Sequence, residues 1–259
     1  MDLVSVGRVE MIGNSKEKDP GQPHLGNCLL CDLLCGVLGV ICTFNGRFDI
    51  AFYMMLAAAV CDFCDGLSAR LLNAYSPVGK ELDSLADMVS FGVLPALMTN
   101  RLMVGIQGES FLAYIPLLIA IFSALRLAKF NIDERQTDNF IGLATPACAM
   151  ICGSFAYYIC KDPASVLNGW AGTRFFIPVV SLILCGLLVS EIPMFSMKFK
   201  KNIKAGTPIH KQRIGFAGVI VVTCVLTLLL GLNWSFIVLM TFVSYIIMNI
   251  GIALIFRKK

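Results

Sequence analysis

Four aspartates at fixed spacing are the residues of this chain best suited to do chemistry. They lie between the strongly apolar stretches AFYMMLAAAV and MVSFGVLPALM, and they are Asp62, Asp65, Asp83 and Asp87. Carboxylates beside segments that are apolar enough for a membrane are costly unless they are paired or bind a cation. The four aspartates therefore predict a functional site.

Helical spacing would bring these carboxylates together. Residues three or four positions apart share a face of a helix, so each pair of aspartates would line one face of its own helix. Pro77 and Gly79 interrupt the chain between the pairs and would let the two helices pack as an antiparallel hairpin. Converging like charges repel unless a cation lies between them, and hard oxygen ligands suit Mg²⁺, Mn²⁺ or Ca²⁺.

Two residues beside the aspartates indicate what such a metal site would act on. Gly66 has no side chain and would let a ligand approach the helix backbone. Arg70 offers a planar fork of donors that suits phosphate. Carboxylates, a divalent metal and an arginine together indicate phosphoryl-type chemistry in which metals clamp the reacting oxygens. A solvated, inert acidic turn between two helices is the alternative interpretation of this stretch.

The elements that must position these residues are membrane-spanning helices. Of the 259 residues, 57% are hydrophobic and only 15% are charged, and the mean hydropathy is +0.78. Apolar segments recur along the whole chain, which predicts an all-α, polytopic membrane helix bundle. We expect about eight spans, at residues 28–44, 48–72, 82–100, 111–130, 141–160, 174–194, 214–231 and 233–256.

The distribution of basic residues predicts the orientation of the bundle. With eight spans both termini lie on one side of the membrane. That side would carry all of the lysines and arginines except Arg47, Arg101, Lys161 and Arg174. The positive-inside rule makes it the cytoplasmic side, and the aspartates fall there too. Residues 1–27, which lack the pattern of a cleaved signal peptide, are expected to form a cytoplasmic segment ahead of a single membrane domain at 28–259.

The acidic stretch also carries a family resemblance. Residues 62–87, DFCDGLSARLLNAYSPVGKELDSLAD, match the pattern D-x2-D-G-x2-A-R-x8-G-x3-D-x3-D at all of its fixed positions. That pattern resembles the signature of the CDP-alcohol phosphatidyltransferase family, integral membrane enzymes of phospholipid synthesis. The surrounding segments GKELDSLADMVSFGVLPAL, ALRLAKFN (124–131) and FIGLATPA (140–147) resemble the phosphatidylserine synthase branch of the family.

The resemblance implies a reaction and a set of roles. CDP-diacylglycerol and L-serine would give phosphatidylserine and CMP. The cofactor would be Mg²⁺ or Mn²⁺, or Ca²⁺ bound in their place. Asp87 would be the general base and would also lie within reach of the metal. The other three aspartates would hold one or two metals on the CDP diphosphate. The residues implied in CDP binding are Asp62, Asp65, Gly66, Ala69, Arg70, Gly79 and Asp83.

Two further segments concern the acceptor and the nucleotide. Arg126, Lys129 and Asn131 lie in a stretch that recurs in phosphatidylserine synthases, which implies binding of the amino acid or of a lipid phosphate; basic residues that only anchor the topology are the alternative. In the first span the resembling synthases read Pro-Asn with a second Asn five residues later. Here Asn27 matches, but Asp32 replaces the second Asn. The role of Asp32 stays open, and a hydrogen bond to a neighbouring helix is the alternative to a site function.

The same residues are compatible with other acceptors and with another class of protein. The acceptor could instead be glycerol 3-phosphate, an inositol compound or another alcohol, because the core pattern is common to the family. From a different class, an aspartate cluster could be the transit site of a divalent-cation transporter. Membrane lipid is an expected partner and nucleic acid is not. By analogy with the family we expect a homodimer in the cell membrane if the source is prokaryotic.

Overall fold

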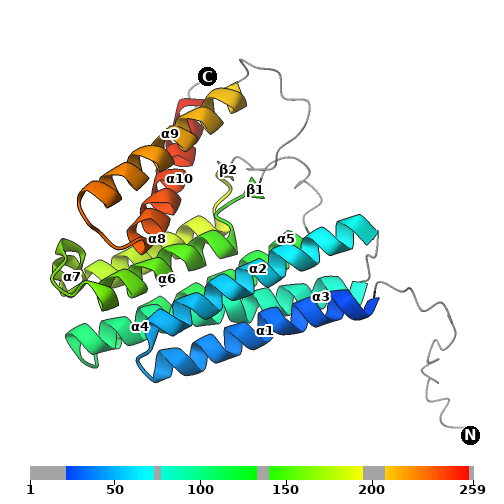
Figure 1. Cartoon of the computed structure of the whole chain (residues 1–259), viewed down its shortest axis with the longest axis horizontal. Coiled ribbons are helices and arrows are strands. Elements are labelled where there is room, and N and C mark those ends of the chain that lie inside the picture. The colour runs from blue at the N-terminus through cyan, green and yellow to red at the C-terminus, as the bar shows by residue number, and fades with distance from the viewer. Residues whose placement is uncertain (1–21, 73–76, 133–139, 195–207, 257–259) are drawn as a thin grey trace, which may run out of the picture.

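The computed structural model describes residues 22–72, 77–132, 140–194 and 208–256. Almost all of them are helical, and the helices follow one another as rods (Figure 1). In chain order they are α1 (Gln22–Phe44), α2 (Phe48–Leu72), α3 (Pro77–Asp87), the π-helix η1 (Met88–Val93), α4 (Leu94–Gln107), the 3₁₀-helix η2 (Phe111–Leu117), α5 (Leu118–Ile132), β1 (Phe140–Ile141), α6 (Thr145–Lys161), α7 (Val166–Ala171), α8 (Phe176–Val189), β2 (Pro193–Met194), α9 (Pro208–Leu229) and α10 (Ser235–Phe256).

The prediction of an all-α polytopic membrane bundle is confirmed. Among the described residues, four helical segments are long and apolar enough to cross a membrane: Phe48–Ser68, Val78–Gln107, Phe111–Ile132 and Ser235–Ala253. Shorter apolar helices cover Leu29–Phe44, Phe176–Val189 and Gly215–Leu229. Each of the eight expected spans therefore coincides with a helix, and in the part of the chain that the structure describes four of them are both long and apolar enough for a full crossing.

Some boundaries differ from those expected. The third span begins at Pro77 rather than at 82, because proline is tolerated in the first turn of a helix. It ends at Gln107 rather than at 100. The expected spans 141–160 and 174–194 each lose a few residues to a short antiparallel pair, in which β1 and β2 match Phe140 with Met194 and Ile141 with Pro193. This pair joins the start of α6 to the end of α8.

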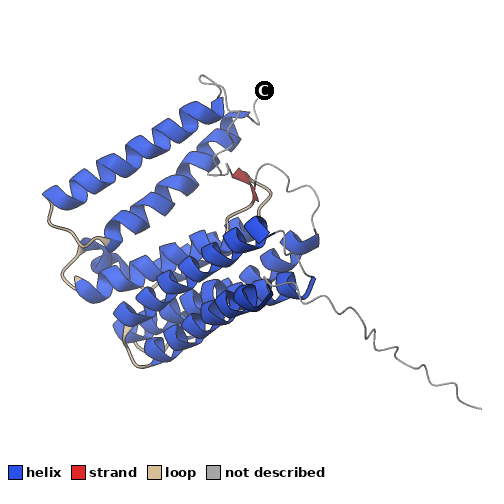
Figure 2. Ribbon diagram, turned by 45° about the vertical axis from the view of Figure 1, so that its right-hand side comes forward, coloured by secondary structure: helices blue, strands red, loops and turns tan. Residues whose placement is uncertain are grey.

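The helices form two groups. Figures 1 and 2 show α1 to α5 as a layer of roughly parallel rods with α6 and α8 packed on it, while α9 and α10 lean away as a pair. α1 packs along α2, α6 against α2 and α4, and α5 against α8. α10 contacts α6 on one side and packs against α9. We call the end at which α2 finishes and α6 begins the motif end, and the opposite end the distal end.

Glycines allow the closest helix contacts. A Cβ on Gly36 of α1 would lie 2.5 Å from Ser90 Oγ and 3.1 Å from the Ser90 Cα in η1. A Cβ on Gly153 of α6 would lie 2.8 Å from the ring of Phe52 and would also overlap Met55, both on α2. Small residues drive helix association in membranes by letting backbones approach in this way. They fix α1 against η1 and α6 against α2.

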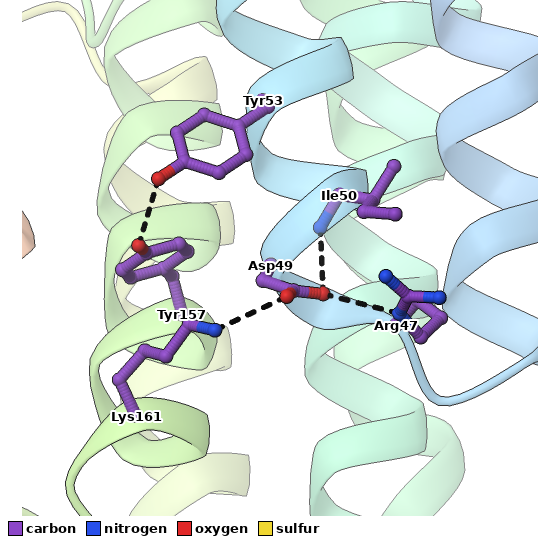
Figure 3. A network of polar contacts seen from close by, with 6 residues as sticks. All are labelled: Arg47, Asp49, Ile50, Tyr53, Tyr157 and Lys161. Carbon is purple, nitrogen blue, oxygen red and sulfur yellow. Dashed lines mark hydrogen bonds and ion pairs between the residues drawn. The ribbon is translucent and has the colours of Figure 1, made fainter.

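A polar network joins α2 to α6 at the distal end (Figure 3). Asp49 accepts hydrogen bonds from Lys161 Nζ at 3.1 Å and from the Ile50 amide at 2.9 Å. The Tyr53 and Tyr157 hydroxyls, one turn further in, are 2.9 Å apart, and the Trp234 ring before α10 stacks on Tyr53. Tyrosine and tryptophan favour the membrane–water boundary because one end of each side chain is polar. The network therefore fits the interfacial level at the distal end.

The contact at Gly153 yields a test of the packing. Gly153→Leu should lower the thermal unfolding temperature in detergent, because overpacking a close-packed contact costs about 1–3 kcal/mol. Gly186→Leu on α8 is the matched control, since a Cβ there would meet no described atom within 4 Å. Equal unfolding temperatures for the two variants would contradict the packing described here.

Candidate active site

Three of the predicted aspartates converge at the motif end. Asp62 near the end of α2 and Asp83 and Asp87 on α3 each offer one carboxylate oxygen, and these oxygens all lie within 4.8 Å of one another. α3 begins directly after the interruption that the sequence shows, and it lies beside η1 and α1. The carboxylates of the two helices therefore converge as expected, but in the described residues α3 packs chiefly on α1 and η1 rather than along α2 as the expected hairpin would require.

Asp65 lies next to this group rather than in it. It follows Asp62 by less than one turn on α2 and is buried, with an exposed fraction of 3%. Its Oδ2 has no hydrogen-bond partner among the described residues. The carboxylate is within electrostatic range of Asp62 and Asp83. Asp65 thus adds negative charge to the site and keeps an oxygen free for a ligand.

Asp32 is a fifth carboxylate at this place. It lies on α1 with an exposed fraction of 1%, and its Oδ1, too, is unpartnered within the part of the chain that the structure describes. Asp62 and Asp83 both act on it electrostatically. Ser90 Oγ of η1 donates a hydrogen bond of 3.1 Å to the Asp32 backbone carbonyl and so fixes this part of α1 beside the cluster.

The π-helix η1 follows the last aspartate directly. It runs from Met88 to Val93, and its residues Ser90, Phe91 and Gly92 are buried against α1 and α5. A π-turn inserts an extra residue into a helix and is often found at functional sites. Here it joins the short helix that carries Asp83 and Asp87 to α4, most of whose residues are buried.

The donor set fits a divalent metal. Asp87 Oδ1 has no hydrogen-bond donor among the described residues, just like the free oxygens of Asp32 and Asp65. Unpaired buried carboxylates are unfavourable, and a cation shared between them removes both the missing partner and the mutual repulsion. All of the available ligand atoms are hard oxygens, which favour Mg²⁺, Mn²⁺ or Ca²⁺.

A buried cation faces the acidic cluster from α5. Arg126 has an exposed fraction of 7%, and its Nη1 donates to Thr145 Oγ1 at the start of α6 at 3.3 Å. Its Nε has no partner among the described residues. Asp87 and Tyr245 of α10 are both within electrostatic range of the guanidinium. A free N–H beside the carboxylates suits an anionic group of a substrate.

The other two residues predicted to bind the acceptor or a lipid phosphate have different surroundings. Lys129 Nζ forms an exposed ion pair with Glu191 at 3.6 Å. Asn131 donates from Nδ2 to Ser84 Oγ at 2.9 Å, and its carbonyl accepts from Lys80 at 3.1 Å. The structure thus brings Arg126 to the cluster but directs Lys129 towards β2. Asn131 forms hydrogen bonds that connect α5 to α3.

The residues predicted to contact the nucleotide lie on the same two helices. A Cβ at Gly66 would meet no described atom within 4 Å, so the backbone of α2 has open space beside the aspartates. Gly79 lies in the first turn of α3. Ala69 and Arg70 continue α2 past Gly66, but their side chains fall outside the part of the chain that the structure describes.

Sequence reasoning left some of this site undefined. It noted Asp32 as unusual but could not place it in the cluster, and it did not identify Ser90 or Tyr245. A carboxylate inside an apolar helix is a usable signal for Asp32. Ser90 and Tyr245 carry no comparable signal, because a serine or tyrosine in a membrane helix is common.

Comparisons with known proteins show the family to which the chain belongs. The model of the CDP-alcohol phosphatidyltransferase family matches residues 27–175, a span that contains all five carboxylates and Arg126. The chain belongs to this family. It is 31% identical over 180 residues to a protein of Bacillus subtilis (strain 168) named CDP-diacylglycerol--serine O-phosphatidyltransferase, covering 68% of this chain and 92% of that protein.

Two further relatives match shorter segments. A Helicobacter pylori (strain J99) protein of the same name is 37% identical over 121 residues, which cover 46% of this chain and 51% of the relative. An archaetidylserine synthase of Methanothermobacter thermautotrophicus is 34% identical over 122 residues, covering 46% of this chain and 52% of the relative. Family membership opposes the interpretation of the cluster as the transit site of a cation transporter.

The converging carboxylates yield a direct test of metal binding. Titration of the purified protein with Mn²⁺, followed by electron paramagnetic resonance, should show bound Mn²⁺, and Asp83→Asn should weaken it by about tenfold or more. Loss of residues that merely orient metal ligands already costs that much. Glu81→Gln, an exposed carboxylate on the same helix, should bind like the unmodified protein. Equal affinity in both variants would exclude Asp83 as a ligand.

Proposed function

We propose that this protein transfers the phosphatidyl group of CDP-diacylglycerol to the hydroxyl of L-serine and so produces phosphatidylserine and CMP. The observation that carries the proposal is the convergence of Asp62, Asp83 and Asp87 next to a buried Arg126. The names of the Bacillus subtilis and Helicobacter pylori relatives support CDP-diacylglycerol and serine as the substrates.

The acidic cluster would bind the activated lipid. Asp62, Asp65 and Asp83 would hold one or two divalent cations, and Asp87 has a carboxylate oxygen within 4.8 Å of oxygens of Asp62 and Asp83. When bound, such cations neutralise charge on the diphosphate and on the departing CMP. Gly66 leaves space beside α2 where the cytidine phosphates can approach the backbone. The family resemblance also implies that Ala69, Arg70 and Gly79 contact the nucleotide, with Arg70 as a donor to phosphate.

Asp87 would act as the general base. A serine hydroxyl is a poor nucleophile at neutral pH, and a positioned carboxylate can remove its proton as the new bond forms. The serine oxygen then bonds to the lipid-linked phosphorus, and the bond between this phosphorus and the oxygen of the CMP phosphate breaks. The proton moves to Asp87, whose Oδ1 is free to receive it because no described group donates to this oxygen.

Arg126 would hold an anionic group during this step. Its guanidinium interacts with Asp87 from the neighbouring α5, so a substrate bound to it lies next to the proposed base. The serine carboxylate and the lipid phosphate are both suitable ligands. A phosphorylated acceptor would need a further basic side chain beside Arg126, and Lys129 already pairs with Glu191.

The membrane setting follows from the charge pattern. We infer that the motif end faces the cytoplasm, because nearly all lysines and arginines fall on that side of the expected topology. Soluble serine and CMP would then enter and leave from the cytoplasm, while CDP-diacylglycerol arrives from the inner leaflet. We further propose that residues 28–259 act as one domain and that the protein functions as a homodimer, by analogy with the family.

An acceptor comparison tests the reaction. Purified protein in detergent with CDP-diacylglycerol and Mn²⁺ or Mg²⁺ should release CMP with serine, and not with glycerol 3-phosphate, inositol or buffer alone. Release with a different acceptor would keep the mechanism and overturn serine as the substrate. Absence of release with every acceptor, from protein that binds CDP-diacylglycerol, would overturn the proposed activity.

A single substitution tests the base. Asp87→Asn removes the proton acceptor and should lower kcat at least about 100-fold, since general-base catalysis contributes about 10²–10⁴. Binding of CDP-diacylglycerol should persist, because Asp62, Asp65 and Asp83 remain. Thermal unfolding with and without CDP-diacylglycerol measures that binding independently of turnover. Near-normal kcat in a correctly folded Asp87→Asn protein would remove Asp87 as the base.

A further inference from the structure

A large cavity lies far from the acidic cluster, in the distal half of the bundle. Its volume is about 490 Å³, and α4, α6, α8 and α10 form its walls, with α7 at one end. Buried side chains of Ile151, Ile177 and Leu239 form its floor. The proposed reaction makes no use of this space, because Asp62 and Asp65 lie at the opposite end of α2 from the Asp49–Lys161 pair next to α7.

The walls of the cavity offer almost nothing to a polar ligand. Its two hydroxyl groups are already used within their own helices: Thr99 Oγ1 donates to the Pro95 carbonyl at 2.8 Å, and Ser181 Oγ donates to the Ile177 carbonyl at 2.8 Å. A water molecule needs two to four polar partners to be stable in a cavity. The lining therefore favours hydrocarbon.

The entrance differs from the floor. Val166 and Trp170 of α7 line the cavity and have exposed fractions of 73% and 56%. The exposed Arg174 follows in the turn that leads to Phe176, another lining residue. Tryptophan and arginine at the end of apolar helices are typical of the level of lipid headgroups, where arginine attracts phosphate.

We propose that this cavity binds one acyl chain of a phospholipid from the leaflet opposite to the acidic cluster. The chain enters beside α7 and packs between α6, α8 and α10, while the headgroup phosphate lies near Trp170 and Arg174. The substrate lipid is a poor fit, since its diphosphate lies at the motif end. A helix of a second copy is also a poor fit: helices are about 10 Å wide, so the cavity has room for roughly one turn. The proposal is independent of the proposed function.

Tryptophan substitutions on adjacent residues of α8 test the proposal. Val180 lines the cavity, whereas Val179 is half exposed on the outer surface of the same helix. Native mass spectrometry of protein purified in mild detergent counts the phospholipids that remain bound. We expect one tightly retained phospholipid in the unmodified protein and in Val179→Trp, and its loss in Val180→Trp. Val243→Trp fills the cavity from α10 and gives the same test if Val180→Trp does not fold.

The remaining outcomes overturn the proposal. Equal retention in Val179→Trp and Val180→Trp, or absence of a retained lipid in the unmodified protein, would show that the cavity holds no lipid chain. A raised KM for CDP-diacylglycerol in Val180→Trp alone would assign the cavity to the substrate. Conversion of a dimer to a monomer by Val180→Trp alone would assign it to a second copy. Lipid loss with unchanged KM and unchanged oligomeric state is the result that we expect.

Discussion

Electrostatic repulsion among buried carboxylates is the constraint on which the structure of the site depends. Asp62, Asp83 and Asp87 bring oxygens within 4.8 Å of one another, and Asp32 and Asp65 add charge from the sides. These carboxylates repel one another, so they do not come together unless the rest of the protein holds them. The surrounding helices do so through contacts that involve no charge, such as the backbone approach of Gly36 to Ser90. Apolar packing thus positions a site that is electrostatically unfavourable until a cation binds.

The opposite charge on α5 gives this site two distinct sides. Carboxylates from α1, α2 and α3 form the side suited to cations. Arg126, which is hydrogen-bonded to Thr145 of α6, forms the side suited to anions. Asp87 interacts with both sides. A group in that position can meet a nucleophile held by Arg126 and an electrophile held at the cluster, which is the arrangement that the proposed transfer requires. The buried Arg126 is also held in place by its contacts, so little conformational entropy remains to be lost on binding.

Sequence reasoning recovered what depends on local periodicity. Apolar segments located the helices, and the spacing of the four aspartates predicted that their carboxylates converge, as those of Asp62, Asp83 and Asp87 do. The rest depends on contacts between segments far apart in the chain. Asp32 joins the cluster only because α1 packs against η1, and Lys129 turns towards Glu191, which lies more than sixty residues later. The π-turn of η1 has no spacing signal either, because its residues MVSFGV are also compatible with an ordinary apolar helix.

The two ends of the bundle are linked by α6. Its first residue, Thr145, holds Arg126 at the site, its middle residues Ile151 and Phe155 line the distal cavity, and its last residue, Lys161, pairs with Asp49. α9 packs chiefly on α10, and α10 packs on α6, so the two last helices rest on this one element. A hydrocarbon chain in the cavity would complete the packing between α6, α8 and α10, where a void would forfeit dispersion contacts. The lipid in the distal leaflet would thereby help to fix the helix that positions the anion-binding arginine, without touching the reacting groups.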